Sequence, residues 1–195
     1  MSDITSPDYW NQRYLEGNTP WDIGYASPPI IEYFKSVTNK DARILIPGAG
    51  NAHEAGWLWK NGFRKLTVVD IAEKPLEALR QALPDLPNEQ TLHMDFFDLE
   101  AEFDLIVEQT FFCALPPSWR KRYTEKMHSL LSPTGRLFGV LFSFPLTADG
   151  PPFGGNREEY HKLFAPIFDV LTLEPCRNSI PPRQGNELFI ELSKR

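Results

Sequence analysis

Residues 43–70, RILIPGAGNAHEAGWLWKNGFRKLTVVD, decide the fold of this chain. A short apolar run leads into Gly48-Ala49-Gly50, a helical segment follows, and a second apolar run ends in Asp70. Strand, glycine turn, helix, strand and acid thus follow one another within about thirty residues. Glycines let the backbone approach a ligand closely, and an acid about twenty residues further on can hydrogen-bond both hydroxyls of a ribose. The stretch predicts a pocket for an adenosine-containing cofactor but does not select one.

The alternation of strands and helices continues on both sides of this stretch. It predicts an α/β fold with a mostly parallel sheet, formed by residues 1–195 as a single domain, because no linker or internal repeat interrupts the pattern. We expect Asn51 to cap the helix after the glycine turn. The expected helices are 7–16, 28–37, 51–61, 73–83, 119–131 and 157–164, and the expected strands are 43–47, 66–70, 90–94, 103–108, 135–142, 169–173 and 188–192.

The composition excludes several classes of protein. The chain has 195 residues, of which 42% are hydrophobic and 24% charged, which is typical of a globular domain with a core. Its net charge of −6 offers no basic face for nucleic acid, and no apolar run approaches the length that spans a membrane. Cys113 and Cys176 have neither metal nor redox spacing, and no signal peptide is visible, so we expect a cytoplasmic protein without a metal.

Polar residues follow the third and fourth expected strands, where parallel strand ends meet in one crevice. Asp95 could hydrogen-bond an adenine amino group, Phe96 could form an apolar wall, and Glu108-Gln109 ends the fourth strand. The loop after the first strand lacks the third glycine that a dinucleotide pyrophosphate prefers, since His53 stands there. S-adenosylmethionine carries no phosphate and does not need that loop, so the pattern favours it over NAD.

Motifs spread over nearly the whole chain resemble the thiopurine S-methyltransferase family, and within it the plant-type halide and thiol methyltransferases. The resemblance implies a Rossmann-like class I methyltransferase fold, with a mostly parallel seven-stranded sheet and helices on both faces. It also implies that residues 1–40 cover the cofactor and the substrate. The matching residues are Trp10, Thr19-Pro20-Trp21-Asp22, Gly24, 45–50, 69–71, 95–97, 103–106, 111–114, Gly150-Pro151-Pro152-Phe153 and 180–185.

The same resemblance implies roles for individual residues. Trp10 and Trp21 would lie over the methionine and sulfonium end of S-adenosylmethionine. After methyl transfer the product of this cofactor is S-adenosylhomocysteine. Three positions depart from the family pattern: Tyr14 replaces a tryptophan, Gln109 an aromatic residue, and Ala49 a cysteine common in relatives. The full set of expected cofactor contacts is Trp10, Tyr14, Trp21, Gly48, Gly50, Asp70 on the ribose, Asp95 and Phe96 beside the adenine, and Gln109.

The expected reaction is direct in-line transfer of a methyl group to a small soft nucleophile: a thiol, hydrosulfide, halide or thiopurine. Such acceptors need little help from a general base, and no His or Lys is placed by a motif, so no catalytic residue is assigned. We expect a monomer that acts on small molecules. Arg183 could attract an anionic acceptor or be a solvated loop charge. The expected pocket residues are Tyr9, Phe111, Phe112, Pro152, Phe153 and Arg183.

Other interpretations stay open at the sequence level. The chain could be a non-catalytic protein that binds S-adenosylmethionine or a partner, and an NAD-dependent oxidoreductase is disfavoured because a Tyr-x-x-x-Lys motif is missing. Asp95 could simply cap a turn, Asp104 and Glu108 could form an acid/base pair, and the four histidines are expected to be structural. Cys113 has no activating base beside it in the sequence.

Overall fold

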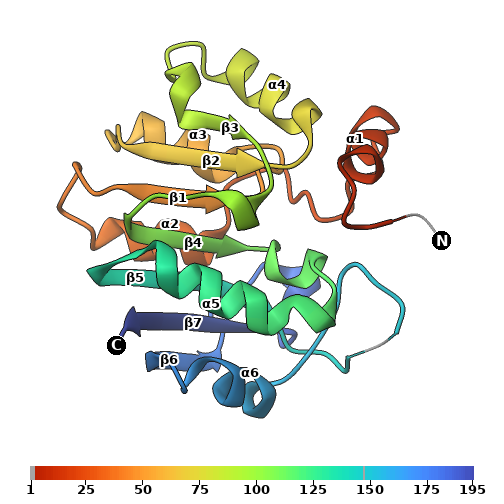
Figure 1. Ribbon diagram of the computed structural model, residues 1–195, viewed down its shortest axis with the longest axis vertical. Helices are drawn as coiled ribbons and strands as arrows, with labels where there is room; N and C mark the ends of the chain where they lie inside the picture. The colour runs from red at the N-terminus through yellow and green to blue at the C-terminus, as the bar shows by residue number, and fades with distance from the viewer. Residues whose placement is uncertain (1–2, 147) are drawn as a thin grey trace.

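One seven-stranded sheet forms the centre of the protein, whose structure, a computed structural model, describes residues 3–146 and 148–195. The strand order is β3-β2-β1-β4-β5-β7-β6, and only β7 runs antiparallel to its neighbours (Figure 1). The predicted α/β class and mostly parallel sheet are confirmed. The strands are β1 Ile44–Pro47, β2 Leu66–Asp70, β3 Thr91–His93, β4 Phe103–Gln109, β5 Leu131–Phe142, β6 Phe168–Pro175 and β7 Glu187–Lys194.

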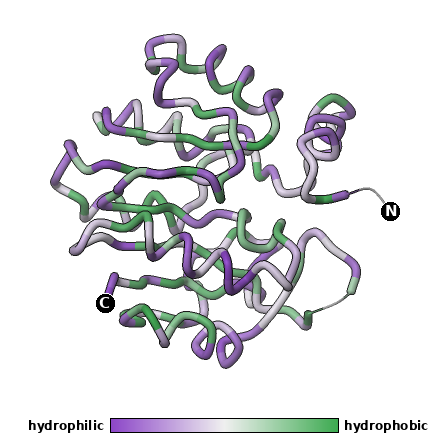
Figure 2. The backbone as a smooth tube through the Cα atoms, in the orientation of Figure 1, coloured by the Kyte–Doolittle hydropathy of each residue, from purple (hydrophilic) through white to green (hydrophobic). Residues whose placement is uncertain are grey.

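Helices cover both faces of the sheet. Strand side chains alternate between the faces, so Ile44 and Ile46 pack on one side while Leu45 packs on the other. The first face is covered by α2, α3 and α4, and the second by α5 and α6. Figure 2 shows the apolar strands enclosed between these helices. The helices are α1 Pro7–Leu15, α2 Pro28–Lys35, α3 His53–Lys60, α4 Glu73–Ala82, α5 Arg120–Leu130 and α6 Arg157–Phe164. In the described part of the chain, no helix is long and apolar enough to cross a membrane.

The glycine turn joins β1 to α3 through a series of left-handed residues. Gly48 and Gly50 have φ values of +76° and +55°, a region that favours glycine. The expectation that Asn51 caps α3 is wrong. Ala52 occupies the cap position with φ +59° and makes no side-chain cap bond, while the Asn51 amide donates to Asp22 instead. A tertiary contact to the N-terminal segment therefore replaces the local cap.

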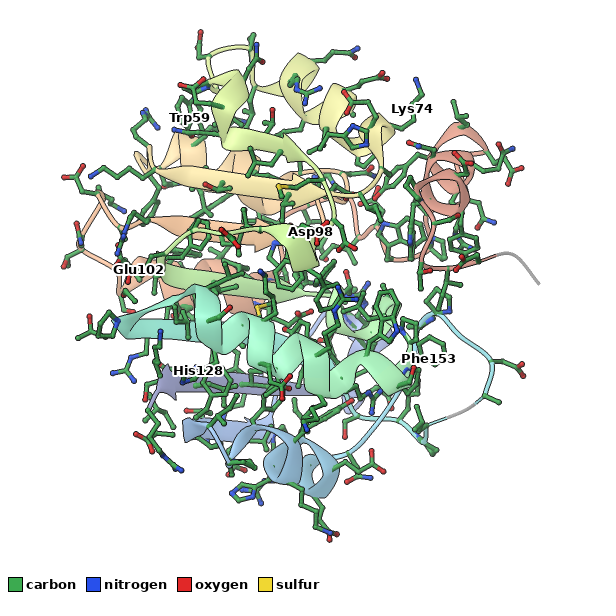
Figure 3. All side chains as sticks on the ribbon, in the orientation of Figure 1. Trp59, Lys74, Asp98, Glu102, His128 and Phe153 are labelled. Atoms are coloured by element: carbon green, nitrogen blue, oxygen red, sulfur yellow. The ribbon has the colours of Figure 1, made fainter. Side chains whose placement is uncertain are left out.

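The N-terminal segment, residues 3–27, lies outside the layers of the sheet. Helix α1 has no buried residue and lies beside the C-terminal ends of the strands (Figure 1). It is attached to the start of α4, where the Lys74 N–H donates to Asn11 at 3.0 Å, and the labelled Lys74 lies next to α1 in Figure 3. Just before α2, the Ser27 N–H donates to Glu54 of α3 at 2.8 Å. The segment is thus held at the sheet edge by polar contacts.

Candidate active site

A cavity of about 300 Å³ opens at the C-terminal ends of the central strands, between them and the N-terminal segment. Every residue expected to contact the cofactor lines it, together with three of the six expected pocket residues. The sequence-predicted residues that line the cavity are Trp10, Tyr14, Trp21, Gly48, Gly50, Asp70, Asp95, Phe96, Gln109, Phe111, Pro152 and Arg183.

Asp70 ends β2 with both carboxylate oxygens held by the backbone. Oδ2 accepts from the Ala49 N–H and Oδ1 from the Ala72 N–H, each at 2.8 Å. Burial raises the pKa of Asp70 to about 6, although these backbone hydrogen bonds oppose the shift. Each oxygen keeps a further lone pair. The carboxylate is therefore ionised at neutral pH and can accept hydrogen bonds from two neighbouring hydroxyls.

The glycine turn uses most of its own backbone donors. The Gly48 N–H donates to the Val69 carbonyl at 2.8 Å, the Ala49 N–H to Asp70, and the Ala52 N–H to the Ala49 carbonyl at 2.9 Å. A pyrophosphate needs such N–H groups free and facing the ligand. The turn therefore suits a ligand that passes close to the backbone without a phosphate. A Cβ at Gly48 would also come within 3.0 Å of the Phe111 ring.

Asp95 has the capping role that one interpretation of the sequence gave it, and it also lines the cavity. Its Oδ1 accepts from the Phe97 N–H at 2.8 Å and so caps the short helical turn that begins at Phe96. Phe96 is almost fully buried, and its ring lies 5.1 Å from that of Phe111. The pair forms an apolar surface beside a carboxylate, which suits a flat heterocycle with an amino group.

Three aromatic residues form a wall over the cavity. The Trp21 ring meets Trp10 and Tyr14 edge-on, at centroid distances of 5.6 and 5.7 Å. The Trp10 indole N–H donates to the Ile4 carbonyl at 2.8 Å, which fixes the ring. Burial, and then the negative charge of Asp70, raise the pKa of Tyr14. The phenol therefore stays protonated and cannot serve as a base at neutral pH.

The loop that carries Trp21 is anchored from two sides. Asp22 accepts from Asn51 and lies 2.8 Å from Nε2 of His53, at the start of α3. The Trp21 carbonyl accepts from Arg183 at 2.8 Å. His53 thus has the structural role expected for it. The Thr-Pro-Trp-Asp motif was visible in the sequence, but the partners of Asp22 were not, because they lie about thirty residues away.

Arg183 is not the solvated charge that one interpretation expected. Its side chain is 12% exposed, lies 3.5 Å from the Glu187 carboxylate and stands over the Phe142 ring at 5.3 Å. Since it also lines the cavity, its charge faces both the site and the loop of Trp21.

Three expected pocket residues do not line the cavity. Tyr9 packs edge-on against Trp10 from within α1, and Phe112 is 1% exposed, in the core between Tyr123 and Tyr160. Phe153 is also buried, and its N–H donates to the Cys113 carbonyl. Phe111 and Pro152 thus line the cavity, while Phe112 and Phe153, the residues that follow them, pack into the core.

Glu108 and Asp104 do not form an acid/base pair. Asp104 lies at the other end of β4, bound to Arg43 at 2.7 Å. Glu108 is fully buried and accepts from the N–H groups of Phe111 and Phe112, both at 2.9 Å, and from the Tyr123 hydroxyl at 2.6 Å. Burial raises the pKa of Glu108 to about 7. Its role is to hold the turn that presents Phe111.

Sequence reasoning missed Arg13, whose guanidinium lines the cavity and lies 5.1 Å from the Trp21 ring centroid. Its position one turn after Trp10 on α1 was the available signal.

Cys113 also reaches the cavity, but its thiol donates to the Thr110 carbonyl at 3.3 Å. Burial raises the pKa of this thiol, which makes it a poor nucleophile. Within the described residues, no group of His, Cys, Asp or Glu could hold a metal ion.

The fold matches that of class I methyltransferases. The structure of the Burkholderia thailandensis 1,6-didemethyltoxoflavin-N1-methyltransferase, with bound S-adenosylhomocysteine, superposes with a TM-score of 0.74 at 20% identity, over 100% of this chain and 92% of that one. NodS, an N-methyltransferase of Bradyrhizobium japonicum, gives a TM-score of 0.70 at 16% identity, over 95% of this chain and 97% of its own. These likenesses concern the fold.

Sequence comparison identifies the family. The profile of the family described as thiopurine S-methyltransferase matches residues 5–188, so the chain belongs to that family. A probable thiol methyltransferase 2 of Arabidopsis thaliana is 30% identical over 91% of this chain and 81% of its own length. A thiopurine S-methyltransferase of Acinetobacter baylyi is 26% identical, over 92% of this chain and 93% of its own length. The protein is accordingly an S-adenosylmethionine-dependent methyltransferase.

Proposed function

We propose that this protein transfers the methyl group of S-adenosylmethionine to a small, soft sulfur or halide nucleophile by direct in-line displacement. The observation that carries the proposal is the make-up of the cavity. It has an aromatic wall, two carboxylates and two arginines, and its described lining includes neither histidine nor lysine. Such a cavity can orient a cationic cofactor and an anionic acceptor. Its two carboxylates, Asp70 and Asp95, accept from backbone N–H groups and would bind the nucleoside, which leaves no side chain to take a proton from the acceptor.

The residues fit the cofactor. Asp70 would accept from the ribose hydroxyls, and Asp95 with Phe96 would border the adenine. Gly48 would let the cofactor pass close to the backbone of the turn. When bound, S-adenosylmethionine supplies an electrophilic methyl carbon on a positively charged sulfur. The Trp21 and Trp10 rings would favour that charge by cation–π attraction before transfer and lose the attraction as the sulfur becomes neutral. That difference helps the product to leave.

The acceptor side lies toward Arg183 and Pro152. There a thiolate would attack the methyl carbon while the bond from that carbon to the cofactor sulfur breaks, giving a thioether and S-adenosylhomocysteine. Phe111 and Pro152 would exclude water from the anion, which raises its reactivity, and Arg183 would balance its charge. No proton needs to move at the protein during this step.

A non-catalytic cofactor-binding protein is the second candidate. It would need the same nucleoside contacts but no space beside the sulfonium. The cavity extends past Gln109 to Arg183, Phe142 and Pro152, and this extension supports the enzyme over the binding protein.

An acceptor panel tests the proposal. The purified protein is incubated with S-adenosylmethionine and, separately, a small thiol, hydrosulfide, iodide, thiocyanate, a thiopurine, a catechol and an amine, and both S-adenosylhomocysteine and methylated product are measured. Turnover of one or more of the sulfur or halide acceptors above the catechol and the amine supports the function. Tight cofactor binding with no turnover of any acceptor would favour the binding protein.

A further inference from the structure

Arg13 presents an unpaired positive charge to the cavity. Among the residues that the structure describes, its guanidinium contacts only neutral groups: the Tyr9 hydroxyl at 3.2 Å, the Asn18 carbonyl at 3.2 Å and side-chain oxygen at 3.5 Å, and the Trp21 ring. Arginine stays charged under all ordinary conditions and binds carboxylates through two parallel N–H donors. A permanent cation therefore lines the site without an acidic partner.

The second cavity arginine differs in this respect. Arg183 has the Glu187 carboxylate 3.5 Å away and donates to the Trp21 carbonyl, so its charge already has a protein counterpart. Both arginines keep unbonded N–H donors, since Arg13 makes three hydrogen bonds and Arg183 two among the described residues, but only Arg13 has no carboxylate beside it.

The place of Arg13 along the cavity indicates which anion. Its guanidinium stands over Trp21, and the Trp21 loop is bound to His53 at the start of α3 and to Arg183 before β7. The N–H of Lys74, in the helix after β2, donates to Asn11 of α1. The N-terminal segment that carries Arg13 is thus attached to the helices that follow β1 and β2, whereas Asp95 follows β3 at the edge of the sheet.

We infer that Arg13 binds the carboxylate at the amino-acid end of the cofactor. The inference rests on the proposed function, which supplies that cofactor. With the nucleoside at Asp70 and Asp95, the amino-acid end extends over the glycine turn, where the N–H groups of Gly48, Ala49 and Ala52 are already bonded within the protein. These bonds leave the turn few donors for a carboxylate, and Arg13 supplies further N–H groups next to the Trp21 ring.

Two ligands, one with and one without the amino-acid carboxylate, can distinguish carboxylate binding by Arg13 from a general packing effect. S-adenosylhomocysteine carries the carboxylate, while 5′-methylthioadenosine keeps the nucleoside and the sulfur but lacks the amino-acid end. Titration calorimetry measures the affinity of each ligand for the wild-type protein and for Arg13→Gln, Arg13→Lys and Arg183→Gln. Arg195→Gln, a variant of an exposed arginine bound to Asp169 on another part of the surface, is the matched control.

The expected result is a selective loss. Arg13→Gln should weaken S-adenosylhomocysteine about 10- to 100-fold, the range of a lost hydrogen bond to a charged group, and change 5′-methylthioadenosine less than about twofold. Arg13→Lys should recover part of the affinity, and Arg195→Gln should change neither ligand. Equal losses for both ligands, no loss, or a selective loss in Arg183→Gln alone would overturn the inference. Wild-type protein that bound neither ligand would instead overturn the proposed function.

Discussion

At the scale of the residue, Asp70 makes cofactor binding depend on pH. Its pKa is raised to about 6 by burial, so the carboxyl gains a proton as the pH falls through that value. In the proposed site the ribose hydroxyls donate to the ionised form of Asp70, so cofactor binding should stabilise that form. The affinity for S-adenosylhomocysteine should fall by about tenfold from pH 7.5 to pH 5 and level off above about pH 7.

Calorimetry across this range checks the prediction, with Asp70→Asn as the test variant. The variant should lose about 1.5–3 kcal/mol of binding free energy at pH 7.5 and show no step near pH 6. A change of affinity of the same size near pH 6 in both proteins would mean that another group titrates. An unchanged affinity in the variant would mean that Asp70 does not bind the ribose.

Trp21 should distinguish the charged cofactor from its neutral product. Trp21→Ala is expected to lose about 0.5–2 kcal/mol more binding free energy for S-adenosylmethionine than for S-adenosylhomocysteine, because only the first carries a cation over the ring. Trp59→Ala is the control, since this tryptophan of α3 stacks with Arg64 and lies far from α1 in Figure 3. Equal losses for the two ligands would mean that the Trp21 ring only packs.

Three of the predicted residues that the structure brings into the cavity, Gly48, Asp70 and Asp95, share a fixed relation to a strand end. Each lies at or shortly after the end of a strand whose apolar pattern could be read locally, and parallel strands bring such positions together. Arg13 and the partners of Asp22 could not be found this way. Their positions depend on how the N-terminal segment packs on the sheet, and no local periodicity encodes that contact.

At the scale of the element, strands and helices were predicted within a few residues because each has a clear apolar pattern. The main local error was the cap of α3, where Asn51 bonds to Asp22 instead of the helix. The pocket errors at Phe112 and Phe153 have another cause. Their segments are short turns without a regular period, so the sequence could not say which of two neighbouring side chains faces the cavity.

The N-terminal segment should fold onto the sheet without being needed for the sheet to fold. Helix α1 buries no residue, and polar contacts attach it, whereas Ala26 and Ser27 just before α2 are buried. A chain that begins at Ala26 should keep its far-UV circular dichroism and a cooperative melt. It should lose at least about 100-fold in affinity for S-adenosylhomocysteine, since several contacts worth about 1 kcal/mol or more disappear together.

Calorimetry and thermal melts of the truncated chain check both parts. The full-length Asp22→Asn variant, which keeps the aromatic residues but weakens the anchor to His53, should fall between the two proteins in affinity. A truncated chain that bound the ligand as tightly as the full-length protein would show that the segment does not cover the cofactor.

At the scale of the whole molecule, charge and shape point to the same class of acceptor. The net charge of −6 and the absence of a basic track in the sequence disfavour nucleic acid, while a cavity of about 300 Å³ fits a small molecule beside part of a cofactor. Its arginines give an anion a favourable field within a negatively charged protein. These charges support the proposal that the acceptor is a small anion.

The pH dependence of turnover should therefore belong to the acceptor and not to the enzyme. Tyr14 is held protonated, the Cys113 thiol is held neutral by burial, and the described lining includes no histidine or lysine. With the carboxylates of Asp70 and Asp95 bound to the nucleoside, as proposed, we expect an acceptor to arrive already ionised. For a set of thiols at saturating cofactor, the rate between pH 6.5 and 9 should follow the ionisation of each thiol. Iodide and thiocyanate, which do not titrate there, should give flat profiles.

Initial rates of S-adenosylhomocysteine formation measure these profiles, and Tyr14→Phe is the matched control. Removing the phenol oxygen should lower the rate without moving the pH at which each thiol profile rises, because the group takes no proton. A common midpoint for thiols of different acidity would reveal a titrating base in the protein. Faster turnover of catechols or amines than of every thiol and halide would contradict the soft-acceptor assignment. The contacts proposed for Asp70 and Asp95 with the nucleoside would not be affected by that result, because they do not depend on the acceptor.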